Sequence, residues 1–270
     1  MTPVYIILGA LAFLLAVYLF LIAPGKKMGV SEYKTTLFAH RGLHNGERAE
    51  NSMSAFRAAV DGGYGIELDI RLSRDGELVV FHDDTLTRVV GIEGRVDEYT
   101  ADELAKMSLS GTGDGIPRFS EVLSLVDGKV PLLVEIKEDA GKYGVSDAAV
   151  KLLSGYSGRY IVESFNPLSI RNFKKQKPEI PVGILSHNYY KEEKYRKPLY
   201  LALRLMLLNV LARPAFIAYC HSDYRSVSFR VAKRLFGAVT FAWTVRSAEE
   251  ERAARAHGFD SVIFENYIPD

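Results

Sequence analysis

The sequence is poor in cysteine and carries almost no net charge. Cys220 is its single cysteine, so the chain has no internal disulfide framework, and a lone thiol fits a reducing compartment. A formal net charge of +1 gives no indication of nucleic-acid binding. With 270 residues, of which 48% are hydrophobic, the chain is long enough to form one large domain.

A run without any charged residue lies at the start of the chain. Residues 4–23 (VYIILGALAFLLAVYLFLIA) are long enough to cross about 30 Å of hydrocarbon as a helix, and Pro24-Gly25 then ends the run. We therefore expect a transmembrane anchor and linker over residues 1–28, followed by a single domain over residues 29–270.

The charges that flank this run predict its orientation. Residues 1–3 carry no charged side chain, whereas a cleaved signal peptide would need basic residues there. Basic side chains follow the run at Lys26, Lys27 and Lys34. The positive-inside rule then predicts a single-pass protein of the cell membrane, with the large domain in the cytoplasm.

Short apolar runs alternate with helical patterns after the anchor. A helix over residues 54–62, capped by Asn51 or Ser52, follows the first run. Eight runs of strand length are predicted, at residues 36–39, 65–70, 130–136, 160–165, 181–185, 216–219, 239–245 and 261–264. Eight strands with intervening helices predict a closed parallel (β/α)8 TIM barrel, whose active residues lie at the carboxyl ends of the strands.

Residues 87–121 depart from this repeat. The segment is rich in glycine and contains one short helical stretch capped near Thr100 and Asp102. We expect an insertion between the second and third barrel units that forms part of the wall of the cleft, with an ordinary surface excursion as the alternative.

Two histidines and a pair of carboxylates are candidate catalytic and metal-binding residues. His40 and His82 each end a short apolar run, and Glu67 and Asp69 stand two residues apart within another. Residues two apart in a strand point to the same face, and two buried carboxylates on one face need a cation. Together these residues predict a metal site with an acid and a base.

A second pair with the same spacing, Glu135 and Lys137, ends the predicted strand 130–136. A third carboxylate would complete the protein oxygen ligands of one Mg²⁺ or Ca²⁺ ion, and the lysine would supply positive charge to a phosphate. The alternative is a structural ion pair between the two side chains.

The order of the motifs resembles the signature of the glycerophosphodiester phosphodiesterases. The motifs are His40-Arg41-Gly42, Glu50-Asn51-Ser52, Glu67-Leu68-Asp69, Asp75-Gly76, His82-Asp83 and Leu86-Thr87-Arg88. The resemblance implies the same barrel, with a divalent ion on Glu67, Asp69 and Glu135 and with His40 and His82 as catalytic acid and base. It also implies substrate contacts from Arg41, Asn51, Lys137 and Trp243.

This resemblance implies metal-dependent hydrolysis of a small glycerophosphodiester to glycerol 3-phosphate and an alcohol, or hydrolysis of the corresponding phosphodiester bond of a lysophospholipid. In the family, the neighbouring glycerol hydroxyl is thought to attack first, giving a cyclic phosphate that water opens. The alternatives are phospholipase C or D activity, including lysophospholipase D activity, and a non-catalytic barrel that binds lipid headgroups. The sequence leaves the released alcohol and the roles of the two histidines open.

Three further features complete the sequence-based expectations. Residues 199–212 are almost wholly apolar and would either lie on the membrane surface or pack as a barrel helix. Arg246 stands where the family pattern often has asparagine, which puts the polar contact of that asparagine in doubt. The remaining histidines are expected on the surface or on helices, at His44, His187, His221 and His257.

Overall fold

A closed barrel of parallel strands forms the centre of the molecule. The computed structural model describes residues 2–27, 29–139 and 141–269. Within them, eight parallel strands pair in a ring: β1 (Leu37–Ala39), β2 (Gly65–Leu72), β4 (Leu132–Ile136), β5 (Tyr160–Ser164), β6 (Val182–Ser186), β7 (Phe216–Cys220), β8 (Val239–Val245) and β9 (Ser261–Phe264). The strand β3 (Leu78–Val80) pairs antiparallel on β2 at the rim. The predicted TIM barrel is confirmed.

The first and last strands close the ring. Ala39 of β1 pairs with Ile66 of β2 on one side and with Phe264 of β9 on the other. Because all eight strands run in the same direction, residues that follow β1 and β9 meet at the same end of the barrel. Segments more than two hundred residues apart in the sequence are therefore neighbours.

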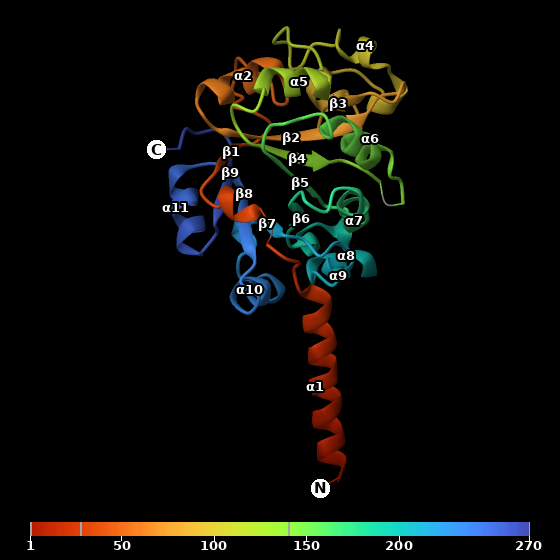
Figure 1. The fold of residues 1–270 in the computed structure, drawn as a ribbon, viewed down its shortest axis with the longest axis vertical. Coiled ribbons are helices and arrows are strands. Elements are labelled where there is room, and N and C mark those ends of the chain that lie inside the picture. Colours follow the sequence, from red (N-terminus) through yellow and green to blue (C-terminus); the bar gives the residue numbers. More distant parts are fainter. Residues whose placement is uncertain (1, 28, 140, 270) are drawn as a thin grey trace.

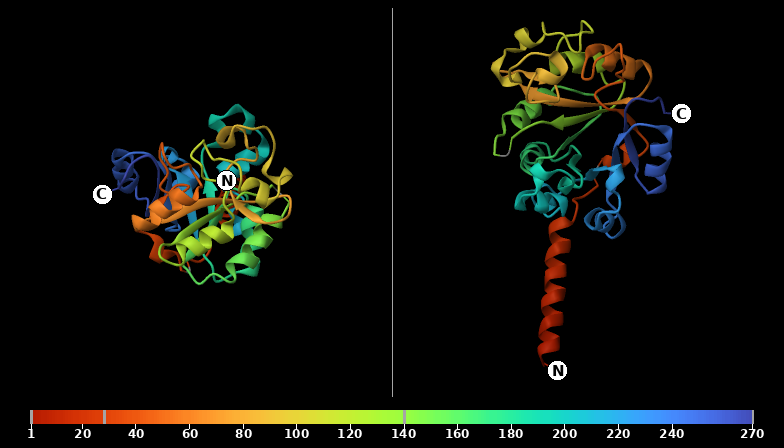
Figure 2. Two further views of the ribbon diagram at one scale, coloured as in Figure 1. Left: turned by 90° about the horizontal axis from the view of Figure 1, so that it is seen from above. Right: turned by 180° about the vertical axis from the view of Figure 1, so that it is seen from behind.

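Helices cover the outside of this barrel (Figure 1 and Figure 2). Most of them have amphipathic patterns that place buried apolar residues against the strands. Ser52 caps the first of them by accepting a hydrogen bond from the Ala55 amide. The helices are α2 (Met53–Asp61), α5 (Phe119–Val126), α6 (Gly144–Leu153), α7 (Pro167–Gln176), α8 (Pro198–Arg204), α9 (Asn209–Ala212), α10 (Val227–Arg234) and α11 (Ala248–Ala256).

Large apolar side chains fill the barrel interior at the amino ends of the strands. Phe38, Phe216 and Phe241 are fully buried, and their rings stack with centroids 5.9 Å and 4.6 Å apart. Val30 and Tyr33, in a short 3-10 helix (Val30–Tyr33) before β1, close this end. The interior is thus packed at the amino ends of the strands, which leaves the carboxyl ends for polar groups.

The insertion after β3 carries its own small core. It contains α3 (Thr87–Val90), a 3-10 turn (Val96–Glu98) and α4 (Ala101–Leu104), with Thr100 as the predicted cap of α4. Leu86, Leu104 and Ile116 are buried among these elements. Part of the segment, at residues 95–97, lines a cavity of about 370 Å³ together with Lys137. Part of the insertion therefore lies beside Lys137, at the carboxyl end of β4.

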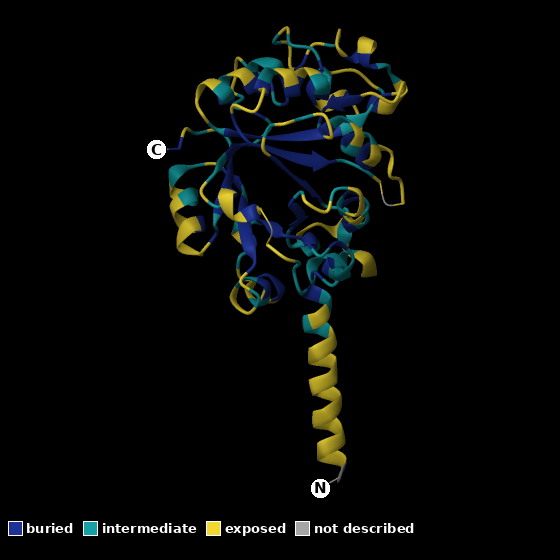
Figure 3. Ribbon diagram, in the orientation of Figure 1, coloured by how far each residue is buried: buried dark blue, intermediate teal, exposed yellow. Residues whose placement is uncertain are grey.

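The helix α1 (Thr2–Ile22) projects from one end of the domain (Figure 1), and most of its residues are exposed (Figure 3). Among the described residues, Pro3–Ile22 is the one helix that is long and apolar enough to cross a membrane. A core helix of a soluble protein would be mostly buried, whereas this one is not. Length and composition are also compatible with a signal sequence.

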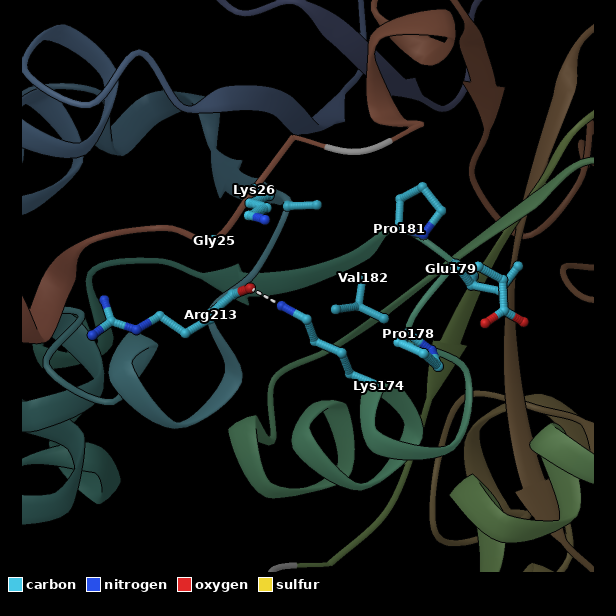
Figure 4. A pocket seen from close by; sticks show the side chains of 10 residues that line it. Gly25, Lys26, Lys174, Pro178, Glu179, Pro181, Val182 and Arg213 are labelled. Atoms are coloured by element: carbon cyan, nitrogen blue, oxygen red, sulfur yellow. Dashed lines mark hydrogen bonds between the residues drawn. The ribbon is translucent and has the colours of Figure 1, made fainter.

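Hydrogen bonds hold the carboxyl end of α1 against the barrel. Arg213 Nη1 donates to the Phe20 and Ala23 carbonyls, both at 3.0 Å, and Asn209 Nδ2 donates to the Ile22 carbonyl at 3.1 Å. Figure 4 shows the Lys174 ammonium donating to the Arg213 carbonyl beside a cavity of about 320 Å³. Arg213 and Asn209 thus satisfy carbonyls at the end of α1, which would otherwise have no partner within the helix.

The apolar segment 199–212 forms α8, α9 and the turn between them. Met206, Asn209 and Ala212 are buried, whereas Leu199 and Leu201 remain exposed. The second half of the segment thus packs on the barrel between β6 and β7, as one of the two predicted alternatives, whereas α8 has no buried residue and carries an exposed apolar edge.

Candidate active site

Three buried carboxylates lie together at the carboxyl ends of two neighbouring strands. Glu67 and Asp69 come from β2, and Glu135 comes from β4, where it pairs in register with Asp69. One oxygen of each lies within 4.8 Å of the others. Strand alternation places all three side chains on one face, as the spacing predicted. The set can hold one hard divalent ion.

The predicted substrate-binding cations surround these carboxylates. Lys137 Nζ lies 2.7 Å from Glu135 Oε1 and 3.1 Å from Asp69 Oδ1. The Arg41 amide donates to Glu67 Oε2 at 2.9 Å, and its guanidinium Nε lies 3.4 Å from Asp69 Oδ2. Asp69 Oδ2 also accepts a hydrogen bond of 2.9 Å from Asn51 Nδ2. The residues predicted to bind substrate, Arg41, Asn51 and Lys137, thus contact the carboxylates in this structure.

Burial and mutual repulsion set the charges of the three carboxylates. Burial raises the pKa of Glu67 well above its ordinary value, and the charges of Asp69 and Glu135 raise it further. Burial also acts on Asp69, but Lys137, His82 and Arg41 hold the pKa of Asp69 well below its ordinary value. Burial and the charges of its neighbours thus favour the neutral form of Glu67, and a bound cation would relieve the repulsion.

His40 extends from the end of β1 toward this cluster. Its Nε2 lies 3.9 Å from Glu67 Oε2, and its Nδ1 is hydrogen-bonded to Glu265 Oε2. Burial lowers the pKa of His40 to about 4, although Glu265 partly opposes the shift. Because the carboxylate engages Nδ1, it orients Nε2 toward the site, which is the arrangement of a positioned acid or base.

Glu265 was missed by sequence reasoning. It directly follows β9, so it occupies the same strand-end position as His40, and that position was the signal available. Burial raises its pKa, but the hydrogen bond and charge of His40, together with Arg246, lower the pKa to about 2. Arg246 Nε lies 3.2 Å from Glu265 Oε1, so the departure from the family pattern at this position supplies a partner for Glu265.

His82 has a carboxylate partner of its own. Its Nδ1 lies 2.6 Å from Asp83 Oδ1, and Arg88 Nε donates to the other oxygen of Asp83 at 2.6 Å. Arg88 also donates to Glu50, which accepts a hydrogen bond of 2.7 Å from Arg41. Burial raises the pKa of Asp83, but His82 and Arg88 hold it well below its ordinary value. A chain of ion pairs thus connects His82 to the carboxylate cluster.

A fourth buried carboxyl group adjoins the cluster. Glu163 of β5 pairs in register with Glu135, and its Oε2 has no hydrogen-bond partner within the described ranges. Burial raises its pKa well above the ordinary value, and the charges of Glu67 and Glu135 add to this shift. Sequence reasoning missed Glu163, although a single charge within the apolar run YIVESF was a visible signal.

Aromatic side chains border the charged groups. Trp243 packs edge-to-face on Phe165 at 5.5 Å, and Lys137 Nζ lies 5.8 Å from the Phe165 ring. The Trp243 Nε1 group is buried without a hydrogen-bond partner among residues that the structure describes. Trp243 therefore lies in the aromatic wall where the resemblance suggested a substrate contact.

Two of the histidines expected on the surface or on helices lie elsewhere. His187 follows β6, and it lines a cavity of about 560 Å³ together with Glu135 and Lys137. His44 lies in the loop after β1, with Nε2 4.0 Å from Glu265 Oε2. The expectation was wrong for both because it considered neighbours in the sequence, whereas the barrel supplies neighbours from other strands.

Comparisons with known proteins agree with this geometry. The model of the glycerophosphoryl diester phosphodiesterase family matches residues 40–268. A glycerophosphodiester phosphodiesterase of Caldanaerobacter subterraneus subsp. tengcongensis is 32% identical over 249 residues, which cover 85% of this chain and 93% of that protein.

Solved structures share the fold. A glycerophosphodiester phosphodiesterase from Thermotoga maritima superposes with a TM-score of 0.65 at 27% identity, covering 85% of this chain and 94% of that one. A phosphodiesterase from Oleispira antarctica, in complex with its product sn-glycerol-3-phosphate, gives a TM-score of 0.72 at 23% identity and covers 87% and 94%. This chain therefore belongs to the glycerophosphoryl diester phosphodiesterase family, and it is an enzyme of that class.

Proposed function

We propose that this enzyme hydrolyses glycerophosphodiesters to glycerol 3-phosphate and an alcohol, with one divalent ion and two histidines as acid and base. One observation carries the proposal: the buried cluster of Glu67, Asp69 and Glu135 adjoins two histidines, each paired through Nδ1 with its own carboxylate. The product found in the Oleispira antarctica phosphodiesterase supports the same reaction.

The residues present fit a hard divalent cation. Three carboxylates converge within 4.8 Å, and their repulsion raises the pKa of Glu67 beyond the effect of burial. Oxygen-only ligands suit Mg²⁺ or Ca²⁺. When bound by Glu67, Asp69 and Glu135, such an ion would withdraw charge from a phosphoryl oxygen.

The side chains of the site supply the remaining chemistry. One of His40 and His82 removes a proton from the attacking hydroxyl or water, and the other protonates the leaving oxygen. Glu265 and Asp83 orient the two rings and stabilise the charged imidazolium that each forms. Arg41 and Lys137 place positive charge beside the phosphate. A glycerol hydroxyl held beside the phosphorus would gain from proximity as the first nucleophile.

We also propose that α1 anchors the enzyme in the cell membrane, with the barrel on the cytoplasmic side. The exposed apolar surface of α1 and the lysines that follow it support this placement. Protease digestion of intact spheroplasts tests it: the barrel should be protected until the membrane is opened. Digestion of the barrel in sealed spheroplasts would contradict the orientation.

The activity is tested with the full chain in lipid nanodiscs. We expect release of glycerol 3-phosphate from glycerophosphocholine with Mg²⁺ or Ca²⁺ and none with a chelator. His40→Ala and His82→Ala should lower the rate at least about 10²-fold, whereas replacement of His257, an exposed histidine away from the site, by alanine should retain it. Full activity of the first two variants, or full activity in chelator, would contradict the proposal.

A further inference from the structure

We infer that His40, His44 and Glu265 form a second metal site, which binds one Zn²⁺ ion and thereby inhibits the enzyme. The inference rests on the proposed function, because it assigns an inhibitor to a histidine that the proposed function makes an acid or base. The second site lies at the ends of β1 and β9, on the side of the His40 ring that faces away from the carboxylate cluster.

The three side chains lie within reach of a single ion. His40 Nδ1 is hydrogen-bonded to Glu265 Oε2, and His44 Nε2 lies 4.0 Å from the same oxygen. One ligand atom from each residue lies within 4.8 Å of the others. The ligand atoms of a tetrahedral zinc ion are about 3.3 Å apart, since each bond to zinc is about 2.0–2.1 Å long. Small side-chain rotations therefore suffice to enclose the ion.

The turn after β1 holds His44 in this position. Gly42 has a φ of 80°, and a Cβ at this residue would lie 3.0 Å from atoms of α2. The Gly42 amide donates to the Ala39 carbonyl at 3.1 Å, and the His44 amide donates to the Gly42 carbonyl at 2.9 Å. The chain thus turns back over the end of β1, where Glu265 follows the neighbouring strand β9. The main chain therefore brings His44 to the same carboxylate as His40.

The ring of His44 has a nitrogen that is free to bind a metal ion. Its Nε2 is buried and makes no hydrogen bond within the part of the chain that the structure describes. The 4.0 Å separation from Glu265 Oε2 is too long for a hydrogen bond. A buried polar atom without a partner costs free energy, and an ion is one of the partners that can satisfy such an atom. Coordination of Nε2 to zinc would therefore remove this cost.

The ligand atoms of the second site favour a different ion from that of the carboxylate cluster. Two imidazole nitrogens and one carboxylate oxygen are a set that binds Zn²⁺ and leaves a fourth position for water. Mg²⁺ and Ca²⁺ prefer oxygen ligands, which the carboxylate cluster provides. A hard ion on the cluster and Zn²⁺ on the two histidines therefore do not compete for the same ligands.

A separate cavity leads to the second site. Its volume is about 330 Å³, and His44 and Glu265 line it together with Gly42 and Tyr267. Of the described residues that line this cavity, none belongs to the carboxylate cluster. A zinc ion therefore has an approach to His44 and Glu265 that does not pass through the cluster.

Zinc on Nδ1 would place the ring proton of His40 on the wrong nitrogen. In the proposed reaction, Glu265 accepts the Nδ1 proton of neutral His40, and the lone pair of Nε2 faces the carboxylate cluster. A metal ion on Nδ1 requires the lone pair of Nδ1, so the single ring proton then resides on Nε2. This Nε2–H group cannot accept a proton, and it is a weaker acid than an imidazolium. Bound zinc therefore removes either catalytic role of His40.

The test measures inhibition of the full enzyme in nanodiscs by Zn²⁺ at saturating Mg²⁺, with glycerophosphocholine as substrate. Saturating zinc should lower kcat at least about 10²-fold, the loss expected when one acid or base fails. His44→Gln should raise the zinc concentration for half inhibition at least about tenfold, since even partners outside the ligand set change metal affinity by that factor. The matched control is His221→Gln, which removes a histidine 3.6 Å from Glu250 and should leave the inhibition unchanged.

Two further measurements test the ligands themselves. Arg246 Nε lies 3.2 Å from Glu265 Oε1, so Arg246→Gln removes a positive charge beside a ligand and should tighten zinc binding about two- to fivefold. Co²⁺ serves as a spectroscopic probe in place of Zn²⁺, because tetrahedral Co²⁺ with nitrogen ligands absorbs visible light strongly and six-coordinate Co²⁺ on oxygen ligands absorbs it weakly. We expect the strong absorption in the wild type and its loss in His44→Gln.

The outcomes separate the second site from the proposed function. Equal inhibition of the wild type and His44→Gln, or relief of inhibition by excess Mg²⁺, would overturn the inference and assign the zinc to the carboxylate cluster. Weak Co²⁺ absorption in the wild type, or unchanged zinc affinity in Arg246→Gln, would overturn it even if His44→Gln failed to fold. No hydrolysis of glycerophosphocholine without zinc would instead overturn the proposed function, whereas the Co²⁺ spectra would still test the second site.

Discussion

The contact between Glu265 and His40 provides the sharpest test of the catalytic arrangement. Glu265→Gln keeps the size of the side chain and removes its charge. The carboxylate is only 14% exposed, so its hydrogen bond with His40 is weakly screened. Hydrogen bonds to charged groups contribute about 1.5–3 kcal/mol. Loss of that stabilisation from the transition state predicts a fall in kcat of roughly 10- to 150-fold.

The pH profile should move in a direction that the structure specifies. Burial lowers the pKa of His40 to about 4, and Glu265 raises it against that shift. Without the Glu265 charge, the pKa of His40 falls further. The limb of the kcat/KM profile that His40 contributes should therefore shift to lower pH, whether His40 serves as base or as acid.

The control variant is Arg246→Gln. Arg246 contacts Glu265 Oε1 at 3.2 Å, whereas His40 binds the other oxygen. Removal of Arg246 should change kcat less than about threefold, because its side chain is half-exposed and solvent therefore screens its ion pair with Glu265. Steady-state kinetics across pH with glycerophosphocholine measure both variants. A Glu265→Gln enzyme with kcat within twofold of wild type and an unshifted profile would refute the positioning role of Glu265.

Three further outcomes are expected. His82→Ala should lower kcat about 10²- to 10⁴-fold without lowering the melting temperature, because its side chain is one-third exposed; loss of both activity and stability would contradict a purely catalytic role. Mg²⁺ or Ca²⁺ at about one hundred times its Kd should raise the free energy of unfolding of the wild type by about 2.7 kcal/mol, as measured by thermal unfolding. Asp69→Asn should abolish this stabilisation. An equal stabilisation of the variant would exclude the Asp69 carboxylate as a ligand. Phe241→Ala should lower the free energy of unfolding in urea by about 3–5 kcal/mol, since the ring is fully buried between Phe38 and Phe216; a change below 1 kcal/mol, on the order of a surface substitution, would be inconsistent with that packing.

Local patterns in the sequence determined the fold class and the centre of the site. Strand alternation placed Glu67 and Asp69 on one face, and the same spacing placed Glu135 beside Lys137. The order of apolar runs predicted eight parallel strands, which positioned these side chains at strand ends. These features were accessible because each depends on residues close together in the chain.

Contacts between distant segments required the tertiary structure. Glu265 lies 225 residues from His40, and the two meet because closure of the barrel sets β9 beside β1. Glu163 joins the carboxylates only through the register of β5 on β4. The cavity from Glu135 to Leu211 likewise depends on how α8 and α9 pack over the strand ends. Sequence periodicity specifies which face a side chain occupies, but only the closed ring of strands specifies which other side chain it meets there.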